Sequence, residues 1–377
     1  MACYLTIFLV KWVHFIVVIK VCLIYAKVSQ YMKKRRAYAL ISGGLDSMLA
    51  VRVIQDQGIE VEGINFYTGF CVEGHTAILH NKDKIKRNNV LWVAEQLGIK
   101  LNIVDISNKY KNILLNPKYG YGKNLNPCLD CKIFMVQQTY ELLQKNNFDF
   151  IITGEVVGQR PMSQRADTMP VVAHQSGAAD LLVRPLSARN LPPTKPEIEG
   201  WIKRDKMSDF SGRSRAGQMA LAKKFNIKEY AQPAGGCCFL TDANYSAKLS
   251  DMWQHRGSRD YELDDIIMLK VGRHLRPAKN YKIIVARDEA EGNYMAGYKN
   301  NHISLEAEDK IPGALCLIEG QPNDDDLQQA ASICAYFGKG RDLSQVTINI
   351  QHLDGKRQQL KVAPIKINKN WFIINKS

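Results

Sequence analysis

The chain has 377 residues, of which 46% are hydrophobic and 23% are charged. This composition is typical of a globular protein and excludes a disordered, collagen-like or disulfide-scaffold chain, while the length allows two or three domains of roughly 100 to 200 residues each. Lysine and arginine outnumber aspartate and glutamate by 51 to 37, which gives a net charge of +14. Most of that surplus lies between residues 32 and 230, and a basic field of this kind favours an anionic partner such as nucleic acid.

The chain begins with an apolar segment, residues 4–25, that is about as long as a bilayer-spanning helix. Lys11 and Lys20 interrupt it, a lysine near the centre of a spanning helix costs roughly 3 kcal/mol, and no small-residue cleavage site follows. Met32 precedes a basic cluster and a strand, so we expect residues 1–31 to be an extension ahead of the true start of a cytoplasmic protein. A membrane anchor is the alternative.

Short apolar runs alternate with amphipathic stretches from residue 37 onward. Strand and helix in alternation predict an α/β domain whose parallel sheet is covered by helices on both faces. The predicted strands are 38–41, 61–66, 100–106 and 148–153, and the predicted helices are about 47–57, 83–97 and 131–145.

Three prolines then interrupt the alternation, and two helices are expected after them. Thr194 with Glu197 three residues later is a capping-box signal for a helix that continues to Lys203. A second, basic helix is predicted over about 215–225.

A different pattern of elements begins at about residue 276 and predicts a separate small α+β domain. Its predicted strands are 282–286, 301–307, 314–320, 346–351 and 360–367, with a helix over about 327–337 that begins at the acidic run 324–326. We therefore divide the chain into the extension 1–31, an α/β domain 32–230, a cysteine-bearing connector 231–275 and an α+β domain 276–377.

Nine cysteines stand at positions 3, 22, 71, 128, 131, 237, 238, 316 and 334. An odd number, with one C-x-x-C and one adjacent pair, indicates metal or redox chemistry in a reducing compartment more than a disulfide framework. Cys316 and Cys334 have apolar neighbours and are expected in the core.

The most specific motif is the hexapeptide SGGLDS, residues Ser42, Gly43, Gly44, Leu45, Asp46 and Ser47, between a predicted strand and a predicted helix. Adjacent glycines let the backbone approach an anion, and the helix N-terminus offers unpaired N–H groups with a partial positive charge. The loop lacks the Walker lysine, so transfer of a γ-phosphate is not indicated. Its hydroxyls can donate to phosphate, and Asp46 can hold Mg²⁺.

This hexapeptide resembles the PP-loop of ATP pyrophosphatases, which cleave ATP between its α- and β-phosphates and activate a carbonyl oxygen as an adenylate. The resemblance implies binding of ATP and Mg²⁺ by Ser42–Ser47, with Asp46 also in a catalytic role. It further implies that Asn65 and Phe66, at the end of the second predicted strand, lie near the adenosine.

Two cysteine segments resemble those of the tRNA 2-thiouridylases within this superfamily. Asn126–Phe134 is similar to the family's segment around the first catalytic cysteine and matches it with Cys131, and Gly235–Leu240 matches the second catalytic cysteine with Cys238. The resemblance implies that both segments converge on the phosphate loop at the C-terminal edge of the sheet.

A third stretch, Thr153–Gln159 followed by Ser163 and Gln164, resembles a ligand-facing loop of tRNA 4-thiouridine synthases and adds Thr153, Gly154 and Gln159 to the expected ATP site. The basic helix near 215–225 is the expected site of phosphate contacts with tRNA. The residues assigned to those contacts are Arg213, Arg215, Lys223 and Lys224. A solvated basic face is the alternative for that helix.

Three roles are open for the cysteines. Cys128, Cys131 and Cys238 could hold an iron–sulfur cluster with one open iron site, since thiolates are the usual ligands. One cysteine could instead carry a persulfide that another resolves as a disulfide. Structural zinc would need a fourth ligand, and Cys237 is a more natural spare thiol because neighbouring residues seldom reach one metal.

The last domain, over residues 283–349, resembles the RNA-binding domain of NFACT proteins, which implies a second contact with tRNA. A dimerisation or packing domain is the alternative.

Together these features predict an ATP-dependent tRNA uridine thiolase that uses ATP and Mg²⁺, a sulfur donor protein or sulfide, and a tRNA, either as a monomer or a homodimer. One alternative is a PP-loop enzyme that adenylates a small molecule for amide or nitrogen transfer. The other is a non-catalytic RNA-binding protein that uses nucleotide as a switch.

Overall fold

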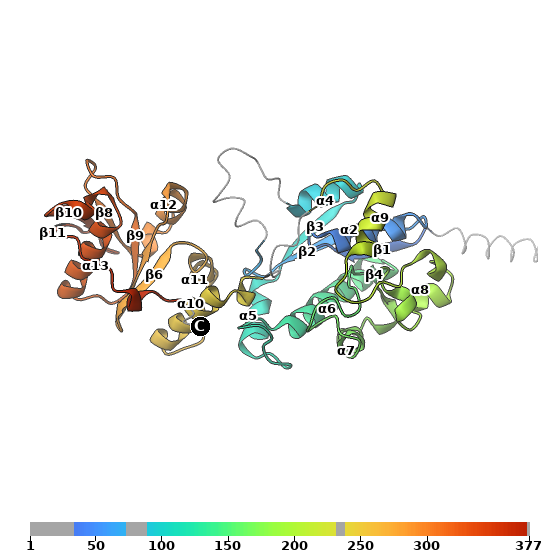
Figure 1. The fold of residues 1–377 in the computed structure, drawn as a ribbon. Coiled ribbons are helices and arrows are strands. Elements are labelled where there is room, and N and C mark those ends of the chain that lie inside the picture. Colours follow the sequence, from blue (N-terminus) through green and yellow to red (C-terminus); the bar gives the residue numbers. More distant parts are fainter. Residues whose placement is uncertain (1–33, 73–88, 231–237, 375–377) are drawn as a thin grey trace, which may run out of the picture.

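The computed structural model describes residues 34–72, 89–230 and 238–374, which form two lobes joined by a short helical connector (Figure 1). The apolar segment 4–25, the expected start at Met32 and the spare thiol Cys237 lie outside the described residues. Across the three described ranges, no helix combines the length and the apolar character needed to cross a lipid bilayer.

The first lobe is built on a parallel sheet with the strand order β3-β2-β1-β4-β5. Its strands are β1 (Arg36–Leu40), β2 (Glu60–Tyr67), β3 (Leu101–Asp105), β4 (Phe150–Ile152) and β5 (Leu182–Val183). The predicted α/β class is confirmed. Because β1 lies between β2 and β4, the segments that follow these three strands emerge side by side at the C-terminal edge, where α/β proteins bind ligands.

Helices cover both faces of this sheet, as expected. On one face α2 (Leu45–Gln55), α4 (Asn89–Leu97) and α9 (Ala216–Lys224) pack together in one hydrophobic core. On the other face α6 (Cys128–Asn146) and α7 (Thr168–Gln175) pack over a second core. The short helix α8 (Lys195–Ile198) lies beyond β5 along the chain.

Three local features differ from the sequence-based expectations. Helix α6 begins at Cys128, three residues early, so both cysteines of the C-x-x-C lie in its first turn. Helix α5 (Ser107–Leu115) was not predicted, because its polar residues mask the buried pair Tyr110 and Leu114 at helical spacing. The capping box that begins α8 is confirmed, but the expected continuation to Lys203 is wrong because the helix already ends at Ile198.

The second lobe is an antiparallel sheet with the strand order β11-β10-β8-β9-β7-β6. Its strands are β6 (Arg273–Ala278), β7 (Tyr281–Val285), β8 (Ile303–Ala307), β9 (Cys316–Gly320), β10 (Val346–Gln351) and β11 (Arg357–Val362), and its helices are α12 (Glu289–Ala296) and α13 (Asp324–Tyr336). The sheet starts at Arg273, slightly before the boundary we expected. Cys316 and Cys334 are buried in the core of this lobe, as expected.

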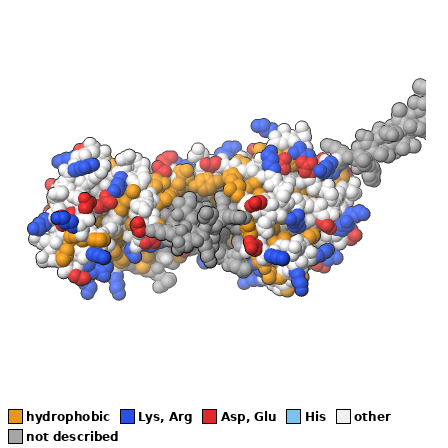
Figure 2. Space-filling model, turned by 90° about the horizontal axis from the view of Figure 1, so that it is seen from above, with side chains coloured by type: hydrophobic (Ala, Val, Ile, Leu, Met, Phe, Trp, Pro, Cys, Tyr) orange, Lys and Arg blue, Asp and Glu red, His pale blue; other side chains and the backbone are white. Residues whose placement is uncertain are grey.

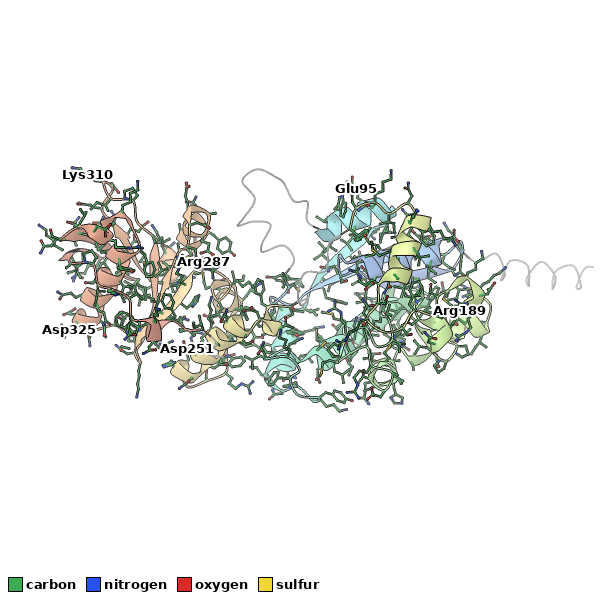
Figure 3. All side chains as sticks on the ribbon, viewed as in Figure 1. Glu95, Arg189, Asp251, Arg287, Lys310 and Asp325 are labelled. Atoms are coloured by element: carbon green, nitrogen blue, oxygen red, sulfur yellow. The ribbon has the colours of Figure 1, made fainter. Side chains whose placement is uncertain are left out.

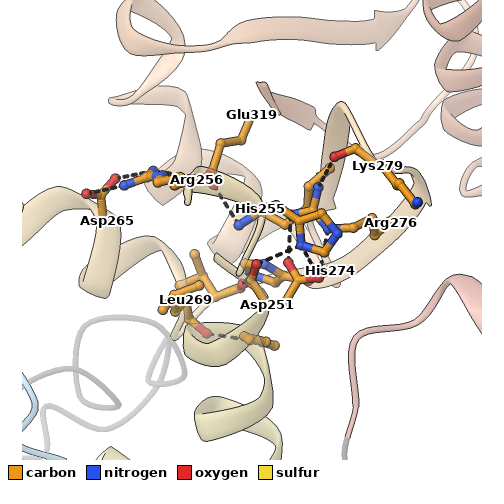
Figure 4. A network of polar contacts seen from close by, with 12 residues as sticks. Asp251, His255, Arg256, Asp265, Leu269, His274, Arg276, Lys279 and Glu319 are labelled. Atoms are coloured by element: carbon orange, nitrogen blue, oxygen red, sulfur yellow. Dashed lines mark hydrogen bonds and ion pairs between the residues drawn. The ribbon is translucent and has the colours of Figure 1, made fainter. Parts of the chain in front are cut away.

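The connector consists of α10 (Ala243–Arg256) and α11 (Leu263–Met268), and ion pairs fasten it to the second lobe (Figure 4). Arg276 on β6 donates from Nε and Nη2 to the two oxygens of Asp251 on α10, both at 2.7 Å. Arg256 at the end of α10 contacts Glu319 on β9 at 2.9 Å. Figure 3 shows Asp251 at the junction between connector and second lobe.

A buried lysine in the connector makes stability depend on pH. Burial, reinforced by the charges of Arg287 and Lys282, lowers the pKa of Lys248 to about 7, and its Nζ donates to the Leu269 carbonyl at 3.1 Å. Between pH 7 and the usual pKa of 10.5, the unfolded chain binds more protons at this site than the folded chain. The free energy of unfolding should therefore rise with pH, by up to about 1.4 kcal/mol per unit from this group.

Thermal denaturation from pH 7 to 10 tests this expectation. In Lys248→Met the contribution disappears, so the rise in Tm should be smaller than in the wild type. Lys195→Met, which removes an exposed lysine, should keep the wild-type profile. Equal slopes for wild type and Lys248→Met would contradict the assignment.

Candidate nucleotide and sulfur site

The hexapeptide Ser42–Ser47 connects β1 directly to α2, as predicted. Gly43 has a φ of +76°, which favours glycine, and Gly44 caps the helix that begins at Leu45. The Ser47 hydroxyl donates to the Gly44 carbonyl at 2.7 Å, which closes the first turn. Because the first N–H groups of a helix have no intrahelical partner, the loop presents donors and positive potential to an anion.

The segment after β4 packs directly against this loop. A Cβ at Gly154 would lie 2.5 Å from the carbonyl carbon and oxygen of Asp46 and 2.6 Å from the Ser47 nitrogen. Backbone atoms cannot move out of the way as a flexible side chain could, so position 154 requires glycine. The expected ATP-site residue Gly154 thus supports the phosphate loop from behind its backbone.

Within the described residues, only one of the two carboxylate oxygens of Asp46 is hydrogen-bonded. Its Oδ2 accepts a hydrogen bond from Gln159 Nε2 at 2.9 Å, and Gln159 Oε1 accepts one from Gln218 Nε2 at 3.3 Å. Its Oδ1 is buried and has no hydrogen-bond partner within the described residues. Mg²⁺ in nucleotide sites is bound by one or two carboxylates together with phosphate oxygens, so this unpartnered oxygen fits such an ion.

Gln218 is a site residue that the sequence-based reasoning missed. It lies on α9, is fully buried, and faces the loop four residues before the buried Ala222. A polar residue in the apolar stripe of an otherwise basic helix was the available signal.

Asn65 and Phe66 lie at the end of β2, beside the phosphate loop. Asn65 Nδ2 donates to the carbonyl of Ile41 at 2.8 Å, which fixes the residue just before Ser42. The Phe66 side chain is buried in the core, so its backbone is the part of the residue that can face a nucleotide. The adenosine contact of both residues stays a prediction.

The N-terminus of α6 is tied to the loop after β4. The Cys128 thiol contacts Ser163 Oγ at 3.6 Å, and Lys132 Nζ lies 3.8 Å from Glu155 Oε1. Asp130 accepts hydrogen bonds from two backbone N–H groups of the preceding loop, which orients this first turn. The helix dipole at this end favours negative charge near both cysteines of the turn.

The buried carboxylate of Glu155 forms ion pairs with Lys132 and Arg184 at this junction. Burial alone would raise the pKa of its carboxyl, but Lys132 and Arg184, with a hydrogen bond from Thr153, outweigh that effect and hold the pKa below its usual value. Arg184 Nε donates to Glu155 Oε2 at 3.2 Å, and Thr153 Oγ1 donates to the same oxygen at 2.8 Å. Thr153 therefore orients the Glu155 carboxylate, and its expected contact with ATP stays a prediction.

Cys131 and Cys238 pack in the same hydrophobic cluster, although they are far apart in sequence. Cys238 is 8% exposed and lies among Phe70, Tyr245 and their neighbours, and Cys131 packs against that cluster. Their convergence fits the expected pair of catalytic cysteines, whose roles stay predictions.

The described cysteines are not grouped as the ligands of a single metal ion would be. In the part of the chain that the structure describes, no group of three or more His, Cys, Asp or Glu residues could hold a metal ion. The iron–sulfur cluster on Cys128, Cys131 and Cys238 and the zinc site stay predictions, and Cys237 lies outside the described residues.

The basic residues assigned to tRNA lie at the two ends of α9, which packs against α2. Gly212 N donates to the Val157 carbonyl at 2.7 Å, so the start of the helix lies beside the loop after β4. Arg213 is exposed, as are both lysines at the helix end, and Arg215 is half-buried. Figure 2 shows Lys and Arg side chains spread over both lobes and hydrophobic side chains gathered between them.

Comparison with known protein families matches each lobe separately. Residues 35–173 match the family described as the tRNA methyl transferase HUP domain, and residues 272–371 match the NFACT protein RNA binding domain. The resemblances expected for the two domains are confirmed.

Among curated proteins, this chain is similar to tRNA-specific 2-thiouridylases. A tRNA-specific 2-thiouridylase MnmA of Campylobacter curvus is 28% identical over 121 residues, which are 31% of this chain and 33% of the relative. The chain thus spans about a third of that relative's length. A tRNA-specific 2-thiouridylase MnmA of Treponema denticola is 23% identical over 294 residues, 71% of this chain and 74% of the relative.

Solved structures are more distant. The crystal structure of a 4-thiouridine synthetase–RNA complex with bound ATP covers 51% of this chain and 52% of its own, with 17% identity and a TM-score of 0.32. A predicted subunit of a tRNA methyltransferase from Methanocaldococcus jannaschii covers 61% of this chain and 91% of its own, with 12% identity and a TM-score of 0.33.

Proposed function

We propose that this chain is an ATP-dependent tRNA uridine thiolase. Its residues 35–173 belong to the tRNA methyl transferase HUP domain family, and its residues 272–371 belong to the NFACT RNA binding domain family. The observation that carries this proposal is the convergence of Cys131 and Cys238 in one cluster, on a lobe whose phosphate loop is held by Gly154 and Gln159. An ATP site alone would not require paired cysteines. The names of the curated relatives point to the same chemistry.

The first half of the proposed reaction is adenylation. The uridine carbonyl oxygen attacks the α-phosphate of ATP and pyrophosphate leaves, while the N–H groups of the loop and the start of α2 stabilise the negative charge. Gln159 holds one oxygen of Asp46 and leaves the other for Mg²⁺. When bound there, Mg²⁺ neutralises phosphate charge and orients the leaving group.

The second half of the proposed reaction is sulfur transfer. A donor places a persulfide on Cys131, whose terminal sulfur attacks the adenylated carbon and displaces AMP. The Cys238 thiolate then attacks the Cys131 sulfur, so that a Cys131–Cys238 disulfide forms and the thiocarbonyl of the product is released. Two protein thiols supply the two electrons that reduce the transferred sulfur, and an external thiol must later reduce the disulfide.

The substrate would reach the site along the basic residues of the first lobe. The proposed contacts with the tRNA backbone are Arg213, Arg215 and the lysines that end α9, since cationic side chains suit phosphate. Arg213 and both lysines are exposed, and Arg215 is half-buried. The second lobe would supply a further contact. The uridine must be flipped or lie in a loop to enter the site.

Pyrophosphate release tests the proposal against its two alternatives. Wild-type protein with ATP should release pyrophosphate only when tRNA is present, and Asp46→Asn should release little. Release that needs an amine or amide donor but no tRNA would favour small-molecule chemistry. RNA binding without any release of pyrophosphate would favour a nucleotide-dependent RNA-binding protein.

The Gln159 amide is expected to contribute to binding of Mg²⁺–ATP. Gln159→Leu removes a hydrogen bond to a charged group, which is worth about 1.5 to 3 kcal/mol, so the dissociation constant for Mg²⁺–ATP should rise roughly tenfold or more. Titration calorimetry measures this directly. Gln137→Leu removes an exposed amide on α6 and should bind like the wild type, and an unchanged constant in Gln159→Leu would contradict the role given to this amide.

A further inference from the structure

We propose that Cys71 and Cys238 form a reversible disulfide, and that Cys71 is the thiol that releases Cys131 after sulfur transfer. The second part of this proposal rests on the proposed function, and the first part does not. Neither the sequence patterns nor the relatives' names give Cys71 a role.

The backbone places the two cysteines directly opposite each other. Cys71 and Cys238 are the partners of an isolated antiparallel bridge, and Phe239 N donates to the Phe70 carbonyl at 2.9 Å next to it. This hydrogen bond flanks the bridge, so the cysteines are a non-hydrogen-bonded pair, in which Cα atoms are about 4.5 Å apart and side chains are close. That separation lies inside the range of 4.4 to 6.8 Å that disulfides span.

The segment that carries Cys71 is held rigidly in this position. The Phe70 ring is fully buried and packs against the rings of Tyr110, Tyr245 and Tyr261. A Cβ on Gly69 would lie 2.6 Å from the Ile266 side chain, which shows how closely α11 covers this segment. The packing of Phe70 and Gly69 therefore positions Cys71 opposite Cys238.

A buried lysine faces this cysteine pair. Lys270 Nζ donates to the Gly69 carbonyl at 2.6 Å and lies 5.1 Å from the centre of the Phe239 ring. Burial lowers the pKa of Lys270 to about 8, while the nearby Cys71 and Cys238 act in the opposite direction. The amine therefore lies near both thiols and contacts the backbone of the segment that carries Cys71.

Each thiol of the pair contacts polar groups that are close to it in sequence. Cys71 Sγ is 3.4 Å from Thr68 Oγ1, and Cys238 Sγ accepts from Leu240 N at 3.4 Å. Formation of a disulfide would exchange these contacts for a sulfur–sulfur bond. None of the six described cysteines forms a disulfide in this structure.

The position of Cys71 also suits a role in the reaction. It follows β2, the strand next to β1, so it lies at the same edge of the sheet as the phosphate loop. Cys131 packs against the cluster that contains Cys238. Cys238 thus lies opposite Cys71 in the bridge and belongs to the cluster against which Cys131 packs.

The proposed step is a thiol–disulfide exchange within the protein. The Cys71 thiolate attacks Cys238 Sγ of the Cys131–Cys238 disulfide, a Cys71–Cys238 bond forms, and the electron pair of the broken bond leaves on Cys131 Sγ, which takes up a proton. No net oxidation occurs. Cys131 is then ready for a new persulfide while an external thiol reduces the Cys71–Cys238 disulfide.

Disulfide mapping of the full-length protein tests the geometric part. Reduced protein is incubated with increasing oxidised glutathione, the remaining thiols are alkylated, and cross-linked peptides are quantified by mass spectrometry. We expect Cys71–Cys238 to be the first disulfide to form, with loss of alkylation at both positions. Cys71→Ser, which keeps a hydroxyl near Thr68, should lose this cross-link, and its melting curve reports that it is folded.

Mapping after a single turnover on adenylated tRNA tests the mechanistic part. Wild-type protein should then carry Cys71–Cys238, and Cys71→Ser should carry Cys131–Cys238 in its place. A Cys131–Cys238 bond that persists in the wild type would overturn the relay while leaving thiolation intact. If the wild type makes no thiouridine, the proposed function fails, and the glutathione experiment still decides the pairing: cross-linking of Cys238 to Cys131 alone would overturn it.

Discussion

Replacing Cys238 or Cys131 by serine is expected to lower the rate of tRNA thiolation by roughly a thousandfold or more, because a hydroxyl can neither carry a persulfide nor complete a disulfide. Release of pyrophosphate should persist in both variants, since the phosphate loop and Asp46 are untouched. Thiouridine formed per mole of released pyrophosphate is the quantity to measure, and it should approach zero.

A matched control separates sulfur chemistry from general damage. Cys334→Ser alters a buried cysteine in the second lobe, where the new hydroxyl can donate to the carbonyls that the thiol now contacts. This variant should thiolate tRNA like the wild type. Full activity in both Cys131→Ser and Cys238→Ser would refute sulfur transfer by this pair and favour amide or nitrogen chemistry.

Gly154→Ala is expected to weaken ATP binding at least tenfold. Its new Cβ would lie 2.5 Å from backbone atoms of Asp46, so the phosphate loop must shift. Overpacking of this kind costs about 1 to 3 kcal/mol, and each 1.4 kcal/mol lost from binding is a factor of ten in Kd. Equilibrium titration with Mg²⁺–ATP gives the dissociation constant.

Gly292→Ala is the control for this substitution. A Cβ there meets only the Ala286 Cβ at 3.9 Å, and the position lies inside α12, where alanine is favourable. It should bind ATP like the wild type. If Gly154→Ala also binds ATP normally, the close approach between this loop and Asp46 is not needed for nucleotide binding.

Local signals account for what the sequence could predict. The hexapeptide Ser42–Ser47 carries its own glycines and lies between a strand and a helix, so both its structure and its position could be read directly. The capping box at Thr194 was equally local. The length of α8 was not, because the left-handed Gly200 that follows it gives no stronger sequence signal than any other glycine.

The features that the sequence could not predict depend on contacts between segments that are distant along the chain. Gln218 reaches Gln159 only because α9 folds back beside the loop after β4, and in sequence it is one polar residue in a basic helix. Cys71 meets Cys238 through a single bridge outside any regular strand. Lys248 and Lys270 belong to the connector segment and look like ordinary surface lysines in the sequence, yet both are buried in the fold.

The most direct test of the central claim is the thionucleoside content of tRNA, measured by mass spectrometry in cells with and without the gene. Loss of the gene should remove one thiouridine, wild-type protein should restore it, and protein with Asp46→Asn or Cys238→Ser should not. An unchanged thionucleoside profile in cells that lack the gene would contradict tRNA thiolation as the function of this protein.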